Sequence, residues 1–150
     1  QGLETLPIRF KKHQDNAEKV ADYLTSKKNV KRVIHPKYSL GLNAERAKKY
    51  LEDGNGPLVG FELDGGIEAG KTFIDSLELV YHVANIGDAR TLAIHPASTT
   101  HSQLSTEDQL RAGVTTGYIR LSVGIEHIDD IINDIDQAIN KAKDKVKNVA

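Results

Sequence analysis

The residues that first suggest chemistry are the stretch GGIEAGKT, which matches the phosphate-loop pattern G-x-x-x-x-G-K-[ST]. Its four fixed positions are Gly65, Gly70, Lys71 and Thr72. In a true phosphate loop the preceding strand is parallel and buried, and an aspartate ending a second apolar strand holds magnesium. No apolar run ending in aspartate follows here, and Asp64 and Glu68 add negative charge where phosphates would bind. The alternative is a turn at Gly65 and a helix that packs closely through Gly70.

The segment 82–105 is the most polar and least periodic part of the chain. Its histidines are His82, His95 and His101, and its serines include Ser98 and Ser102. No carboxylate joins the histidines at a recurring metal-ligand spacing, and no G-x-S-x-G elbow marks a hydrolase serine. We therefore predict neither a metal site nor a hydrolase triad.

Arg120 lies in YIRLSVGI (118–125), the clearest strand pattern of the chain. Alternation places Arg120 and Ser122 on one face and the apolar side chains of Ile119 and Leu121 on the other. A strand arginine on a polar face is either an ordinary exposed charge or a rigidly held fork of donors for a carboxylate. Periodicity does not choose between these two interpretations.

Helices and strands must alternate along the chain to position these groups. We expect helices over 5–27, 43–53, 67–80, 105–113 and from 127 into the 140s, and strands over 30–36, 57–65, 91–97 and 118–125. Asn43 can cap the second helix, and Ser105 with Asp108 can cap the fourth.

The strands are apolar on one face only, whereas a parallel sheet covered on both faces would be apolar on both. We therefore predict an α+β fold, with an open, mainly antiparallel sheet of about four strands and helices on one face. The other face is expected to carry Arg120, Ser122 and His95, and either to be solvated or to meet another domain.

Composition limits the possible partners. The chain has 150 residues, 39% hydrophobic and 27% charged, with a net charge of −1 and no cysteine. These values fit one globular domain without a broad basic surface for nucleic acid, and no apolar run approaches a membrane span. We expect a cytoplasmic domain with no nucleic-acid or membrane partner.

Two long motifs resemble the C-terminal domain of the Cys/Met-metabolism family of pyridoxal-phosphate enzymes. They are ANIGDARTLAIHPASTTHSQLS (84–105) and GYIRLSVGIEHIDDII (117–132), and the resemblance extends over nearly the whole chain. Together with GFELDGGIEAGKTFIDSL (60–77), the first motif looks most like the O-acetylhomoserine sulfhydrylase branch. The resemblance implies that residues 1–150 form the small C-terminal domain of a fold-type-I enzyme, and that the phosphate-loop match is a coincidence.

The resemblance also implies site residues. Arg120 occupies the position of the arginine that binds the substrate α-carboxylate, and Thr100 matches a position near the bound substrate. Asn85 lies in a segment that lines the substrate site, where many members carry serine. His95 and His101 belong to the loop architecture. The lysine that holds pyridoxal phosphate lies in the family's larger N-terminal domain, so we assign no catalytic or cofactor-binding residue here, and Lys71 is not that lysine.

The implied activity is replacement of the γ-acetate of O-acetylhomoserine by sulfide, which gives homocysteine in methionine biosynthesis. Partners would be the amino-acid substrate, sulfide and the missing N-terminal domain, and full-length relatives are commonly homotetramers. The chain alone is expected to be inactive. Alternatives within the family are methionine or cystathionine γ-lyase and cystathionine γ-synthase. Alternatives outside it are a free-standing, non-catalytic binding domain and the nucleotide binder.

Overall fold

A computed structural model describes residues 2–149, so the two end residues of the predicted domain lie outside the described part. The helices are α1 (Leu6–Thr25), α2 (Leu42–Tyr50), α3 (Gly66–Ser76), α4 (Thr106–Arg111) and α5 (Ile128–Val149). The strands are β1 (Val30–Ile34), β2 (Leu58–Leu63), β3 (Tyr81–His82), β4 (Leu92–Ile94) and β5 (Tyr118–Ser122), and short 3₁₀ turns occur at Pro36–Tyr38 and Pro96–Ser98.

The five strands form one sheet in the order β1-β2-β5-β4-β3. β2 is antiparallel to β1 and β5, and β4 is antiparallel to β5, so the predicted α+β fold with a mainly antiparallel sheet is confirmed. The strand count of about four was low by one: β3 lies at the edge, parallel to β4. A strand of two residues is too short to show period-two alternation, which explains why the sequence did not reveal it.

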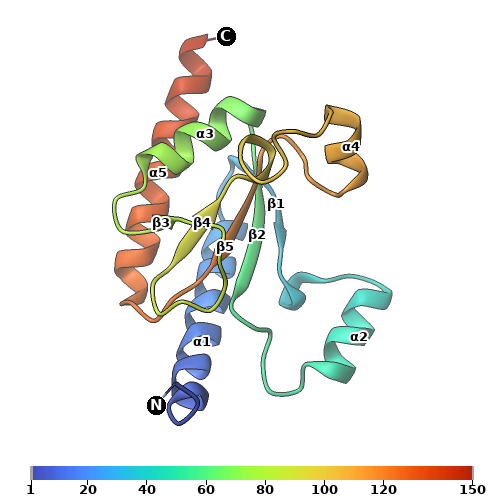
Figure 1. The fold of residues 1–150 in the computed structure, drawn as a ribbon, viewed down its shortest axis with the longest axis vertical. Coiled ribbons are helices and arrows are strands. Elements are labelled where there is room, and N and C mark those ends of the chain that lie inside the picture. Colours follow the sequence, from blue (N-terminus) through green and yellow to red (C-terminus); the bar gives the residue numbers. More distant parts are fainter. Residues whose placement is uncertain (1, 150) are drawn as a thin grey trace.

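The core lies between the sheet and the helices α1, α3 and α5, which cover one face (Figure 1). The inward face of β5 is Ile119 and Leu121, as predicted, and both side chains are fully buried. The long helix α5 contributes Ile131, Ile135 and Ile139 to the same core. This packing leaves the opposite face of the sheet without a helical layer.

Two elements stand away from this core. Helix α2 has no buried residue and projects to one side of the sheet (Figure 1). The prediction that Asn43 caps it was wrong, because the helix begins at Leu42 and Gly41, at φ 55°, is the capping position, two residues before Asn43. The cap of α4 was predicted correctly: the Ser105 hydroxyl accepts a hydrogen bond from the Asp108 N–H at 3.2 Å.

Helix α3 ends at Ser76, earlier than the predicted residue 80. The reason is a tertiary contact: the Asp134 carboxylate of α5 accepts hydrogen bonds from the N–H groups of Glu78, Leu79 and Val80, each at 2.9 Å. These bonds replace the helical ones and turn the chain toward β3. A distant carboxylate of this kind leaves no local signal in the sequence.

The connection from β3 to β4 shapes the open face of the sheet. Parallel strands cannot be joined by a tight hairpin, so the chain must cross over between them. Here residues 83–91 make that crossing without a helix, and they bond to the far end of β5 and the turn that follows it. The polar segment 83–91 is therefore brought to the sheet beside Arg120.

Candidate functional site

Arg120 lies at the middle of β5, paired with Gly60 of β2 on one side and Ile94 of β4 on the other. Its neighbours Ile119 and Leu121 face the helices, so its side chain lies on the open face, as alternation predicted. Gly60 has no side chain, and the ring of Tyr118 fills that space, because a Cβ at Gly60 would lie 2.8 Å from it. The arginine is thus held at the centre of the sheet.

The guanidinium of Arg120 is only partly satisfied. Its Nη2 donates to the backbone oxygen of Asn85 at 3.3 Å, while its buried Nε has no hydrogen-bond partner. Among the described residues, no carboxylate lies within salt-bridge distance of Arg120, whereas Arg32 pairs with Glu62 and Arg111 with Glu107. A buried donor without an acceptor is costly, and an anionic ligand would supply the acceptor.

Asn85 is the predicted site residue that the structure brings to Arg120. Its contribution is the backbone oxygen, since its side-chain Oδ1 accepts a hydrogen bond from the N–H of Ile86 at 2.9 Å. The residue is exposed, so the carbonyl, the amide and the guanidinium form the edge of an accessible polar site.

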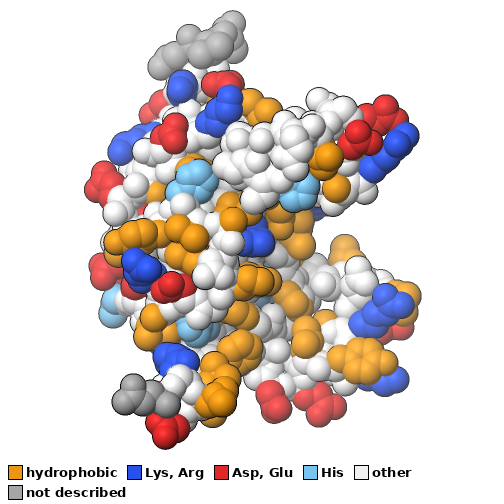
Figure 2. Space-filling model, in the orientation of Figure 1, with side chains coloured by type: hydrophobic (Ala, Val, Ile, Leu, Met, Phe, Trp, Pro, Cys, Tyr) orange, Lys and Arg blue, Asp and Glu red, His pale blue; other side chains and the backbone are white. Residues whose placement is uncertain are grey.

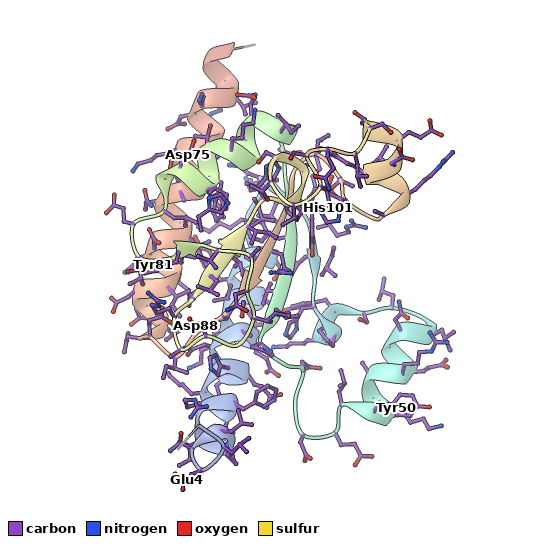
Figure 3. All side chains as sticks on the ribbon, viewed as in Figure 1. Glu4, Tyr50, Asp75, Tyr81, Asp88 and His101 are labelled. Carbon is purple, nitrogen blue, oxygen red and sulfur yellow. The ribbon has the colours of Figure 1, made fainter. Side chains whose placement is uncertain are left out.

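Thr100 is not brought into contact with Arg120 or Asn85 by any described interaction. It is exposed in the turn after β4, and its hydroxyl lies 2.9 Å from Nδ1 of His101. In Figure 3, His101 lies beside α4. Asp88, which belongs to the 83–91 segment, lies at the other end of the sheet. Any role for Thr100 toward the same ligand remains a prediction.

The expectation that His95 shares the face of Arg120 was wrong. In β4, Leu92 and Ile94 are level with Ser122 and Arg120, so His95 points to the helical side, where it is fully buried. A Cβ at Gly70 of α3 would overlap the imidazole ring. The alternation error arose because both faces of this short strand are buried, which removes the polar-apolar contrast.

Both ring nitrogens of His95 have protein partners. Nε2 lies 2.8 Å from the backbone oxygen of Thr116 and Nδ1 lies 2.7 Å from the Ser98 hydroxyl. A carbonyl oxygen only accepts, so Nε2 carries the proton and donates it, and Nδ1 can accept from Ser98. Burial lowers the pKa of His95 below the ordinary value of 6.5, which favours this neutral form. The histidine joins α3, β4 and the turn before β5.

This buried histidine predicts acid sensitivity. Burial also lowers the pKa of His35, so the unfolded chain binds protons at both positions before the folded chain does. The stabilisation is complete above about pH 6.5 and is lost as the pH falls through the lowered folded-state pKa values. We expect the urea midpoint, followed by circular dichroism, to fall between about pH 7 and pH 5. In His95→Gln the urea midpoint should depend less steeply on pH. A midpoint that does not change with pH in the unaltered chain would contradict the prediction.

The GGIEAGKT stretch does not have the setting of a phosphate loop. The strand before it, β2, is antiparallel to both neighbours. Lys71 is an exposed helix residue whose Nζ lies 3.3 Å from Glu68, and Gly70 provides the space for His95. The glycines therefore serve a turn and close packing, which was the alternative drawn from the sequence.

Two broader observations bear on the kind of site. Within residues 2–149, no group of three His, Asp or Glu side chains is arranged to hold a metal ion. No helix in the same range is long and apolar enough to cross a membrane.

The surface around the open face is hollowed between the parts that lie over α4 and α2, and hydrophobic side chains line the hollow (Figure 2). Ile34 and Leu58, whose partners across the sheet are Gly60 and Ser122, are 43% and 37% exposed. These residues share the face of Arg120. The open face therefore combines exposed apolar side chains with one unpaired cation.

Residues that the sequence interpretation left without a role complete this region. The Ser122 hydroxyl accepts a hydrogen bond from the N–H of Gly87 at 3.0 Å. The Glu126 carboxylate accepts from the N–H of Thr91 at 2.6 Å and from its hydroxyl at 2.9 Å. Alternation had placed Ser122 on the face of Arg120. The bond of its hydroxyl to Gly87 could not be predicted in the same way, because it depends on how residues 83–91 cross the sheet.

Fold and site together define an α+β domain that presents an unpaired arginine on the open face of a sheet. Residues 1–140 match the model of the Cys/Met metabolism PLP-dependent enzyme family. The chain belongs to this family, whose members use pyridoxal phosphate.

Individual relatives agree with that assignment. The O-acetyl-L-homoserine sulfhydrylase of Leptospira meyeri is 54% identical over 140 residues, which are 93% of this chain and 32% of the relative. An L-methionine gamma-lyase of Fusobacterium nucleatum is 42% identical over 141 residues, 94% of this chain and 35% of the relative.

A crystal structure of an O-acetylhomoserine (thiol)-lyase of Campylobacter jejuni, which carries a pyridoxyl-lysine phosphate, matches with a TM-score of 0.86 and 45% identity. The match covers 93% of this chain and 33% of that one. The chain thus spans about a third of the length of the relatives it matches.

Proposed function

We propose that this chain is the C-terminal domain of an O-acetylhomoserine sulfhydrylase. The reaction exchanges the γ-acetate of O-acetylhomoserine for sulfide, so that a carbon–sulfur bond forms, a carbon–oxygen bond breaks and acetate leaves with homocysteine as product. The chain supplies the wall of the active site that binds the substrate α-carboxylate, and it is inactive alone.

The observation that carries this proposal is the unsatisfied guanidinium of Arg120. Its buried Nε lacks a partner, its Nη2 is held by Asn85, and no described acidic side chain neutralises it. A carboxylate can accept two parallel N–H bonds from such a fork. A β-strand at the centre of a sheet fixes the fork in place, so the substrate carboxylate would be held in one orientation.

Pyridoxal phosphate, when bound, supplies an electron sink for the carbon atoms of the amino acid. The residues of this chain fit a role toward the substrate better than a role in holding the cofactor. Lys71 is exposed and paired with Glu68, and it lies in the middle of α3, a helix on the face of the sheet opposite to Arg120. We therefore assign the cofactor lysine to a larger N-terminal domain, with the present residues 1–150 as the smaller domain.

The partners follow from that arrangement. The exposed apolar residues beside Arg120, among them Ile34 and Leu58, would meet the N-terminal domain and close the cleft around the cofactor. The substrates are O-acetylhomoserine and sulfide, Thr100 lies near the bound substrate, and the full-length enzyme is a cytoplasmic homotetramer.

A second candidate is a methionine γ-lyase, favoured by the relative of that name at 42% identity. The carboxylate-binding arginine serves both reactions, so Arg120 does not separate them. The discriminating event is the fate of the γ-substituent: a sulfhydrylase adds sulfide, whereas the lyase releases methanethiol from methionine.

The test uses the full-length protein with pyridoxal phosphate. Homocysteine formation from O-acetylhomoserine and sulfide is measured beside methanethiol release from methionine. The proposal requires the first activity to exceed the second. Faster methanethiol release would transfer the assignment to the lyase, and a cofactor-loaded protein without either activity would sink both assignments.

A further inference from the structure

The crossing segment, residues 83–91, is attached to β5 and to the turn after it at alternate residues. The backbone oxygen of Asn85 accepts from Arg120, and the N–H of Gly87 donates to the Ser122 hydroxyl. Two residues further along, the backbone oxygen of Ala89 accepts from the N–H of Ile125 at 2.8 Å. Asn85, Gly87 and Ala89 are thus tied to β5 or to the turn after it.

Ser122 provides the side-chain anchor nearest to Arg120. It lies two residues after Arg120 on the same face, and only 1% of its surface is exposed. Its Oγ accepts the Gly87 N–H at 3.0 Å. Gly87 has a φ of 77°, a left-handed conformation that glycine adopts readily, so the chain can turn its N–H toward the strand here.

We propose that Ser122 is a positioning residue for substrate recognition, because its hydroxyl fixes residues 85–87 and thereby the carbonyl that orients the Arg120 guanidinium. This inference rests on the proposed function, in which Arg120 binds the substrate carboxylate. Nη2 of Arg120 donates to the Asn85 oxygen, and the buried Nε has no hydrogen-bond partner. The direction of the guanidinium therefore depends on a short piece of backbone that Ser122 holds two residues away.

Removing the hydroxyl leaves the Gly87 N–H without its acceptor and releases the middle of the segment. The Asn85 oxygen then loses its fixed place, and the guanidinium must be ordered when ligand binds. The loss should weaken the binding of a carboxylate ligand by about threefold to tenfold, the effect typical of one neutral hydrogen bond. A ligand that lacks the carboxylate should not sense the change.

The experiment measures equilibrium binding to the full-length holoenzyme by calorimetry, with homoserine and with 3-aminopropan-1-ol, its counterpart without the carboxylate. In Ser122→Ala we expect homoserine to bind about threefold to tenfold more weakly and the amine to bind as before. Hydrogen exchange at the Gly87 amide should also be faster. Ser26→Ala is the matched control, since the exposed Ser26 hydroxyl bonds to the backbone of Tyr23 at the end of α1.

The outcomes separate this inference from the function beneath it. Unchanged homoserine binding in Ser122→Ala, with a clear loss in Arg120→Ala, would overturn the role of Ser122 and keep the proposed function. Equal weakening of both ligands would show general damage to the site and would also overturn the inference. If Arg120→Ala leaves the preference for homoserine over the amine unchanged, the carboxylate role of Arg120 fails, and the inference fails with it.

Discussion

Arg120→Ala in the full-length holoenzyme should lower kcat/KM for O-acetylhomoserine by about tenfold to a hundredfold. The estimate follows from the worth of a hydrogen bond to a charged group, roughly 1.5–3 kcal/mol. The side chain lies on the open face and takes no part in the core, so the variant should fold normally. Steady-state kinetics with varied substrate, alongside a circular dichroism spectrum, measures the effect.

The matched control for this change is Arg32→Ala. Arg32 also extends from a strand of the sheet, but it is already paired with Glu62 at 3.6 Å and its side chain is 55% exposed. We expect its removal to change kcat/KM less than twofold, since exposed ion pairs contribute little. Equal effects of the two substitutions would show that general positive charge matters and that Arg120 is not a specific anchor.

Gly70→Ala should destabilise the fold by about 1–3 kcal/mol, the usual range for an added group in a closely packed interior. The new methyl group would overlap the ring of His95, which cannot move without losing its bonds to Thr116 and Ser98. Urea denaturation followed by circular dichroism of the helices would show the lower midpoint.

Lys71→Ala is the control in the adjacent helix position. Its side chain is exposed, so its removal should change the free energy of unfolding by no more than about 0.5 kcal/mol. If Gly70→Ala is as stable as the unaltered chain, close packing does not explain this glycine. A phosphate loop would need Lys71 for nucleotide binding, whereas the packing explanation of Gly70 gives Lys71 no role.

Local patterns in the sequence were sufficient to predict most of the fold. The one-sided alternation of β5 correctly placed Arg120 on the face opposite Ile119 and Leu121, because that face is open in the structure. Ser105 and Asp108 marked the start of α4, since capping depends on residues three positions apart. Where the determining contact is local, the residue types carry the information.

Contacts between distant segments account for what the sequence did not reveal. The end of α3 depends on Asp134, which lies more than fifty positions away from the N–H groups whose hydrogen bonds it accepts. His95 faces the helices because Gly70 leaves space for it, which alternation within a strand of three residues cannot indicate. The bond from Arg120 to the Asn85 oxygen likewise depends on how residues 83–91 cross the sheet.

The alternating attachment of residues 85, 87 and 89 also constrains how this segment can vary in length. Surface loops usually tolerate inserted and deleted residues. Here one added residue between Asn85 and Ala89 would move at least one of the three attached groups away from its partner on β5 or in the turn after it. Working variants of this domain should therefore differ in the identity of these residues and keep their number constant, and insertions should accumulate elsewhere, around the projecting helix α2.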